Sequence, residues 1–163
     1  MTLEGISCFR DPFYPHLHRA RGDEQAEKVG MRVLEYLDGS ELADPGDLRT
    51  NPQRVPLQDP YSVRCAPQML GTFADVLDLA RRWVQMDINA VTDNPLLFLD
   101  LEREYKTMSG GNFHGEPIAF ALDFLAIAMS ALAGISERRL ERLVNPALIA
   151  MARKSRANAI GSP

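Results

Sequence analysis

The sequence is poor in cysteine, in aromatic residues and in excess positive charge. Only two of its 163 residues are cysteines, Cys8 and Cys65, and they form no CxxC pair. This usage indicates neither a disulfide framework nor a zinc site and is typical of a reducing compartment, so we expect a cytoplasmic protein. The amino end also lacks the basic and long apolar regions of a secretory signal, which agrees with that expectation.

Acidic residues outnumber basic ones by 22 to 18, which gives a formal net charge of -4 at pH 7. Proteins that bind nucleic-acid phosphates or anionic lipids usually present a basic field to them. We therefore expect neither nucleic acid nor a membrane as a partner.

Length and composition place the chain among ordinary globular proteins. Hydrophobic residues make up 45% of it and charged residues 25%, and a chain of this length can bury one hydrophobic core. Apolar residues recur at helical spacing over residues 23–37 and 66–90, and a third helix is expected from Pro117 to about Val144. The sequence therefore predicts an all-α fold built from long helices.

The segments between these helices carry turn-forming residues. Residues 1–22 show no sustained period and predict irregular structure with at most a short opening helix. Residues 40–60 contain four prolines and predict a surface loop. Over residues 91–111, two turn signatures surround the apolar run from Leu96 to Leu99, which predicts a loop or a small hairpin.

The run from Ile118 to Ile135 is apolar enough to raise the question of a membrane span. Six of its residues are alanine and one is glycine, Asp123 lies inside it, and no aromatic belt flanks it. We therefore favour a helix that is buried in a helical bundle or a subunit interface over one that crosses a membrane. Because so small a monomer has few helices to cover it, we expect an oligomer.

Three short patterns resemble metal or anion motifs without completing them. His114-Gly-Glu116 lacks the downstream cysteine pair of zinc deaminases, and His16-x-His18 lacks a third ligand and predicts surface histidines in a loop. The glycines after Ser109 are not followed by the Lys-Ser/Thr of a phosphate loop and predict a tight turn. We therefore expect no metal site.

A more informative pattern precedes the helix at residues 66–90. Gln58, Tyr61 and Arg64 recur at a spacing of three, which would place an amide, a phenol and a guanidinium on one face of a helical or 3₁₀ turn. A guanidinium pairs with a carboxylate through two hydrogen bonds, and a phenol can donate or transfer a proton, so this face could hold an amino acid. The alternative is a helix cap in which Arg64 pairs with a nearby acid and Tyr61 is half buried.

Four longer motifs carry a resemblance to a known family. In chain order they are QDPYSVRCAPQ from Gln58, TDNPL from Thr92, SGGNFHGEP from Ser109 and ISERR from Ile135. Together they resemble the aromatic amino acid lyase family and, within it, the histidine ammonia-lyases. The resemblance implies mostly helical homotetramers, in which long helices form a central bundle and active sites are shared between subunits.

The resemblance also implies a reaction, the removal of ammonia from an aromatic amino acid to give an unsaturated acid such as urocanate. It implies that Arg64 binds the substrate carboxylate and that Tyr61 and Gln58 lie beside the substrate and the prosthetic group, so that Tyr61 and Arg64 are the catalytic candidates. Phe113 would line the pocket.

Two further residues and the choice of substrate follow from the same resemblance. Asn94 and His114 would support the pocket. The run from Asn112 to Glu116 is more similar to the histidine enzymes than to their phenylalanine relatives, so histidine is the favoured substrate.

The chain departs from the family in lacking Ala-Ser-Gly, the tripeptide that cyclises to the electrophile methylidene-imidazolone. The family's segment with this tripeptide and the proton-abstracting tyrosine would precede Met1, and Met108-Ser109-Gly110 is not expected to replace it. We expect residues 1–148 to form a partial lyase-like helical domain and residues 149–163 a polar tail. The isolated chain should be inactive, with the electrophile supplied by another chain; the alternatives are an inactive binding module and a truncated relic.

Overall fold

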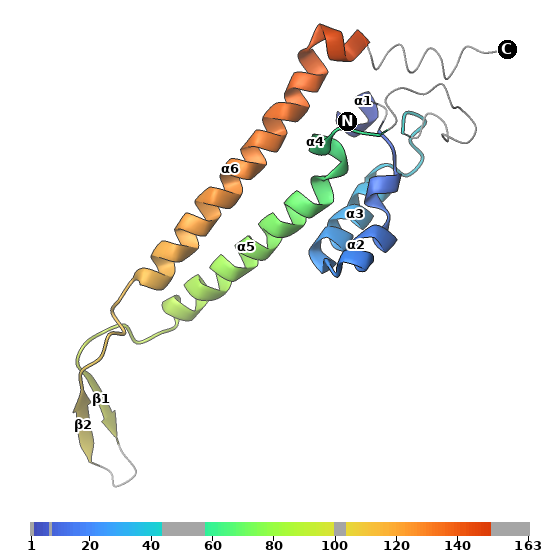
Figure 1. Cartoon of the computed structure of the whole chain (residues 1–163). Coiled ribbons are helices and arrows are strands. Elements are labelled where there is room, and N and C mark those ends of the chain that lie inside the picture. Colours follow the sequence, from blue (N-terminus) through green and yellow to red (C-terminus); the bar gives the residue numbers. More distant parts are fainter. Residues whose placement is uncertain (1, 7, 44–57, 100–103, 151–163) are drawn as a thin grey trace, which may run out of the picture. The chain divides into compact units, whose positions relative to one another are not determined.

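The computed structural model describes residues 2–6, 8–43, 58–99 and 104–150, which form helices and one β-hairpin (Figure 1). In chain order the elements are α1 Thr2–Gly5, η1 Asp11–Phe13, α2 Pro15–Arg21, α3 Glu24–Tyr36, α4 Tyr61–Arg64, α5 Ala66–Ile88, β1 Leu96–Leu99, β2 Tyr105–Met108 and α6 Glu116–Val144. The chain divides into two compact units, of which the first comprises Met1–Asp75 with Met129–Pro163 and the second Val76–Ala128.

The three long helices and the hairpin confirm the corresponding sequence predictions. Helix α3 begins where predicted because the side chain of Asp23 accepts a hydrogen bond from the Ala26 amide at 2.9 Å and so caps its first turn. The predicted loop at residues 40–60 lies mostly outside the described residues, as does most of the predicted tail. Residues 146–150 are again helical.

The prediction of irregular structure over residues 1–22 is wrong for the seven residues of α2. Pro15 occupies the first helical position, where its fixed φ suits a helix, and Gly22 ends the helix with a left-handed φ of 74°. A seven-residue helix spans only two turns, too few to establish a helical period in the sequence.

Small residues let the helices of the first unit approach closely. A Cβ atom on Gly30 of α3 would lie 2.6 Å from the carbonyl oxygen of Phe13, and one on Gly71 of α5 would lie 2.6 Å from the backbone nitrogen of Ala26. The core beside these contacts consists of Cys8, Phe13, Leu37, Ala43, Val63 and Ala66, with Leu3, Ile6, Val33, Leu34 and Leu70 partly buried against it.

His18 belongs to this interior, which corrects the prediction of a surface histidine in a loop. It lies in α2 and is fully buried, while His16 is exposed. Its Nδ1 lies 3.3 Å from the side-chain nitrogen of Gln68, and its Nε2 has no hydrogen-bond partner. His18 is buried because α2 turns this side chain toward the core, whereas the prediction assumed an exposed loop.

In the second unit, β1 and β2 pair antiparallel, with Leu96 opposite Met108 and Leu99 opposite Tyr105. The end of α5 contacts the beginning of α6 through aromatic rings. The Trp83 and Phe124 centroids are 6.0 Å apart, and Phe120 stacks on Phe124 at 6.1 Å. Such ring pairs add to the stabilisation that burial provides.

Helix α6 is long and apolar enough to cross a membrane, and among the described residues no other helix is. Length and composition alone meet this test, and core helices of soluble proteins meet it too. Only 11% of its most apolar window is buried, and Phe120, Ile127 and Met129 are among its exposed side chains. The described residues of this chain therefore do not bury this helix, and its burial against another chain stays a prediction.

The close approach of α5 to α3 predicts that Gly71→Ala lowers the free energy of unfolding by about 1 to 3 kcal/mol, because the added Cβ overlaps the Ala26 backbone. The matched control is Gly134→Ala on α6, where a Cβ meets nothing within 4 Å. That change should raise the free energy of unfolding by up to about 1 kcal/mol, the helix preference of alanine over glycine. Urea unfolding of the full chain measures both, and equal effects would contradict the close packing.

Candidate functional site

The first group of candidate residues lies at α4, a single helical turn. Pro60 precedes it in extended conformation, and its carbonyl accepts hydrogen bonds from the amides of Val63 and Arg64, both at 2.9 Å. The Cys65 amide then bonds to the carbonyl of Tyr61 at 3.0 Å. Only Cys65 separates this turn from α5, so α4 is the turn that leads into that helix.

Tyr61 and Arg64 meet on one side of this turn, as the spacing of three predicts. The guanidinium carbon of Arg64 lies 4.5 Å from the centroid of the Tyr61 ring, a cation–π arrangement. Tyr61 is 70% exposed and Arg64 is half buried. The phenol ring therefore supports the guanidinium while its other face stays accessible.

Arg64 has no carboxylate partner among the described residues, and its Nε is buried without a hydrogen bond. The alternative interpretation required an ion pair at Arg64 and a half-buried Tyr61, and the described residues provide neither. A half-buried guanidinium without a carboxylate partner among the described residues can pair with an anionic ligand through its accessible nitrogens.

Gln58 does not share this helical face. It lies in a bend before Pro60 and is exposed, so the spacing of three holds as helical geometry only for Tyr61 and Arg64. Asp59 points inward instead, and its carboxylate accepts a hydrogen bond from the Phe9 amide at 2.6 Å. Asp59 was not among the predicted site residues, because its only local signal is an Asp-Pro pair before a helix.

A second residue that sequence analysis did not single out is Arg139, at the end of the ISERR motif. Its Nε donates a hydrogen bond to the carbonyl of Ser62 at 2.7 Å. Helix α4 is therefore tied to both the amino-terminal segment, through Asp59, and α6, through Arg139.

The second group of candidate residues lies where the hairpin joins α5 and α6. The side-chain oxygen of Asn94 accepts hydrogen bonds from the Ser109 hydroxyl at 3.1 Å and from the Gly110 amide at 2.7 Å. The side chain of Asn112 donates to the carbonyl of Val91 at 3.3 Å. The TDNPL and SGGN motifs thus bond to each other and close the base of the hairpin.

His114 and Phe113 follow this loop at the start of α6. His114 Nδ1 accepts a hydrogen bond from the Glu116 amide at 3.2 Å, which satisfies one of the unpaired donors of the first helical turn. Phe113 is 61% exposed. His114 therefore caps the first turn of α6, and the ring of Phe113 is exposed at the surface of this unit.

The six predicted site residues are divided between the two units. Tyr61 and Arg64, which the structure brings together, belong to the first unit with Gln58. Asn94, Phe113 and His114 belong to the second, where Asn94 and His114 each bond to a neighbouring loop or helix end. Across the described ranges, no three His, Cys, Asp or Glu side chains gather as metal ligands.

Comparison with known proteins shows which family this chain is similar to. The family model described as aromatic amino acid lyase matches residues 1–155. Histidine ammonia-lyase of Geobacillus sp. (strain WCH70) is 50% identical over 149 residues, which cover 91% of this chain and 27% of that protein. The enzyme of Bacillus cereus (strain AH187) is 46% identical over the same length. The chain spans about a quarter of the length of these relatives.

Solved structures give the same result. Histidine ammonia-lyase from Trypanosoma cruzi matches 91% of this chain with 36% identity and a TM-score of 0.69, over 25% of its own length. Tyrosine aminomutase from Streptomyces globisporus matches 91% of this chain, and 30% of its own, with 33% identity and a TM-score of 0.79. With a family model over nearly the whole chain, relatives half identical in sequence and the same helical arrangement, this chain belongs to the aromatic amino acid lyase family.

Proposed function

We propose that this chain forms the carboxylate-binding and pocket-forming part of a histidine ammonia-lyase-type site, and that another chain supplies the electrophile-bearing segment. The reaction is the elimination of ammonia from an aromatic amino acid, with histidine converted to urocanate as the favoured case. The observation that carries the proposal is Arg64, whose guanidinium is half buried, stacked on Tyr61 and without a carboxylate partner among the described residues.

The guanidinium of Arg64 gives this proposal its energetic basis. A hydrogen bond to a charged group contributes about 1.5 to 3 kcal/mol, so a half-buried guanidinium without a carboxylate partner among the described residues favours an anion that can pair with it. An amino acid carboxylate fits a guanidinium through two parallel hydrogen bonds. Arg64 would therefore orient the substrate, and Tyr61, whose ring lies against that guanidinium, would lie beside it.

The family resemblance also implies roles for the remaining candidates. Gln58 would contact the substrate or prosthetic group from the exposed bend before α4, and Phe113 would line the pocket with its exposed ring. Asn94 and His114 would support it indirectly, because their hydrogen bonds hold the loop that carries Phe113. These assignments rest on the family resemblance.

Methylidene-imidazolone, when present, would supply the electrophile of the reaction. None of these 163 residues can form it, since Ala-Ser-Gly is absent and the hydroxyl of Ser109 is bonded to Asn94 in an exposed loop. What this chain can provide is positioning of the substrate, which does not replace an electrophile. We therefore propose that the isolated chain is inactive.

The partners proposed here follow from α6. Exposed apolar side chains of this extent are usually buried by a partner. We propose that other copies of this chain or other lyase segments bury them rather than lipid, because Asp123 interrupts the apolar run. Nucleic acid is not proposed, given the negative net charge. Since Cys8 and Cys65 form no disulfide, we propose a reducing, cytoplasmic location.

A second candidate function is that of an inactive binding module that retains only carboxylate recognition. The same observation at Arg64 favours it, and the absence of Ala-Ser-Gly is consistent with it. A truncated relic without ligand is the remaining possibility. Activity in a mixture separates the first candidate from the second, and binding separates the second from the relic.

In the activity test, the purified chain is mixed with a lyase segment that carries Ala-Ser-Gly, and urocanate formation is followed by absorbance. Each component alone should be inactive and the mixture active. Arg64→Ala should lower kcat/KM of the mixture by about a hundredfold, the scale of losing a charged substrate contact. Arg81→Ala, an exposed arginine on α5, is the matched control and should have no effect. No gain of the mixture over the segment alone would contradict a catalytic role.

In the binding test, calorimetry compares L-histidine with histamine, which lacks only the carboxylate. Histidine should bind the full chain at least about tenfold more tightly than histamine, because only histidine can pair with the Arg64 guanidinium. Arg64→Ala should abolish the difference, and Arg64→Lys should keep only part of it, since an ammonium cannot form the two-bond fork. Equal affinity of the wild-type chain for both ligands would rule out carboxylate recognition at Arg64.

The exposed face of α6 predicts association. Native mass spectrometry of the full chain should show oligomers, alone or with lyase segments, and Ile127→Lys should reduce them while leaving the helical circular dichroism unchanged, because a charge would be buried in the contact. The control is Glu137→Lys on the charged part of the same helix, which should leave the oligomers in place. A wild-type chain that stays monomeric in both settings would contradict the proposal.

A further inference from the structure

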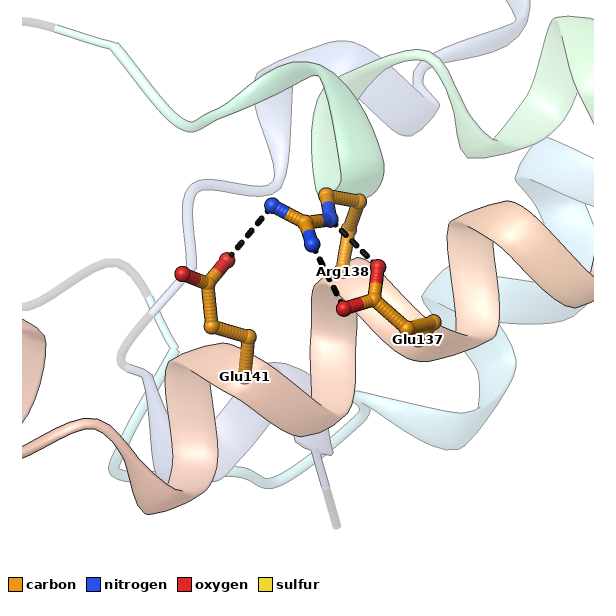
Figure 2. Close-up of polar contacts among 3 residues, drawn as sticks. All are labelled: Glu137, Arg138 and Glu141. Atoms are coloured by element: carbon orange, nitrogen blue, oxygen red, sulfur yellow. Dashed lines mark hydrogen bonds and ion pairs between the residues drawn. The ribbon is translucent and has the colours of Figure 1, made fainter.

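Two consecutive arginines on α6 have different surroundings. Arg138 is an exposed surface residue, and Figure 2 shows its guanidinium between the carboxylates of Glu137 and Glu141. It contacts Glu137 at 2.5 Å through two nitrogens and Glu141 at 3.0 Å. The hydrogen bonds from Arg138 hold the pKa of the Glu137 carboxyl below its usual value. Both nearby carboxylates are therefore engaged by Arg138.

The side chain of Arg139, the next residue, points toward α4 in the first unit. It is half buried, and burial lowers the pKa of its guanidinium from the ordinary arginine value. Among the described residues it makes no ion pair, and its hydrogen bond is the one from Nε to the Ser62 carbonyl at 2.7 Å. Partial removal of a charge from water without a counter-ion is unfavourable, so this contact must compensate for part of that cost.

The carbonyl of Ser62 is a suitable partner for a cation. It belongs to the last turn of a four-residue helix, where carbonyls have no partner within the helix. A carbonyl oxygen without a backbone partner accepts a strong hydrogen bond from a charged donor such as a guanidinium. Arg64 follows two residues later in the same turn, so a hydrogen bond that holds the Ser62 carbonyl also restrains the backbone that carries Arg64.

We infer that Arg139 is a positioning residue of the proposed site, which holds α4 through the Ser62 carbonyl and thereby fixes the direction of Tyr61 and Arg64. What Arg64 binds rests on the proposed function, whereas the contact of Arg139 with α4 does not. Arg139 lies 77 positions after Ser62 in the sequence, so its hydrogen bond joins α4, the proposed carboxylate-binding turn, to α6.

The contact is tested by amide hydrogen exchange in the full chain. Arg139→Ala should speed the exchange of the Arg64 and Cys65 amides about tenfold, the scale of losing one hydrogen bond to a charged group, while the amides of α3 keep their rates. Arg139→Lys keeps a donor and should give an intermediate rate. Arg138→Ala removes the neighbouring, ion-paired arginine and should leave α4 unchanged. If Arg139→Ala and Arg138→Ala exchange alike at α4, the inference is wrong.

Should Arg139→Ala speed exchange in α3 as well, the chain has lost its fold, and Arg139→Lys then decides the matter. Faster exchange confined to residues 61–65 in that variant supports the inference, and wild-type exchange there overturns it.

A second readout links the contact to ligand binding. Arg139→Ala should weaken the binding of L-histidine about tenfold, Arg139→Lys should recover part of the loss, and Arg138→Ala should have wild-type affinity. If the wild-type chain binds no histidine, the proposed function fails while the exchange experiment still decides the role of Arg139. If the wild-type chain binds and Arg139→Ala binds equally well, the positioning role is refuted and the proposed function stands.

Discussion

The attachment of α4 to distant parts of the chain is the constraint on which the first half of the candidate site depends. Helix α4 is a single turn without a side-chain cap, and only Cys65 separates it from α5. Before α4, the carboxylate of Asp59 accepts a hydrogen bond from the Phe9 amide, 50 residues away in the sequence. Within α4, the Ser62 carbonyl accepts a hydrogen bond from Arg139, 77 residues away. The stacked pair of Tyr61 and Arg64 thus has a defined direction only in the folded first unit.

The second half of the candidate site is organised differently, by local contacts. Asn94 bonds to the loop at Ser109 and Gly110, and His114 bonds to the first turn of α6. Both sets of bonds close a short stretch of chain around the base of the hairpin. Phe113 is carried by this loop and stays exposed. Because these bonds join residues that are close together in the sequence, this loop needs no distant part of the chain to hold it.

The chain also presents a large apolar surface for its size. Helix α6 carries more of the exposed large hydrophobic side chains than any other described element. Its charged stretch begins at Glu137, where Arg138 lies on the surface and Arg139 is half buried. The chain covers about a quarter of the length of its relatives. The exposed apolar face of α6, the lack of a carboxylate partner for Arg64 among the described residues and the absence of Ala-Ser-Gly are all consistent with the proposal that this segment works together with other chains.

Local chemistry in the sequence determined the long helices, the hairpin and the pairing of Tyr61 with Arg64, because periodicity, caps and turn residues act within a few positions of one another. Its motifs also indicated the family. Only the tertiary structure decided that His18 is buried, that Gln58 leaves the helical face while Asp59 turns inward, and that Arg139 rather than Arg138 reaches α4. Two adjacent arginines look equivalent in a sequence. They differ in the fold because α4 packs against Arg139, partly removes it from water and provides an unpaired carbonyl, whereas Arg138 stays at the surface.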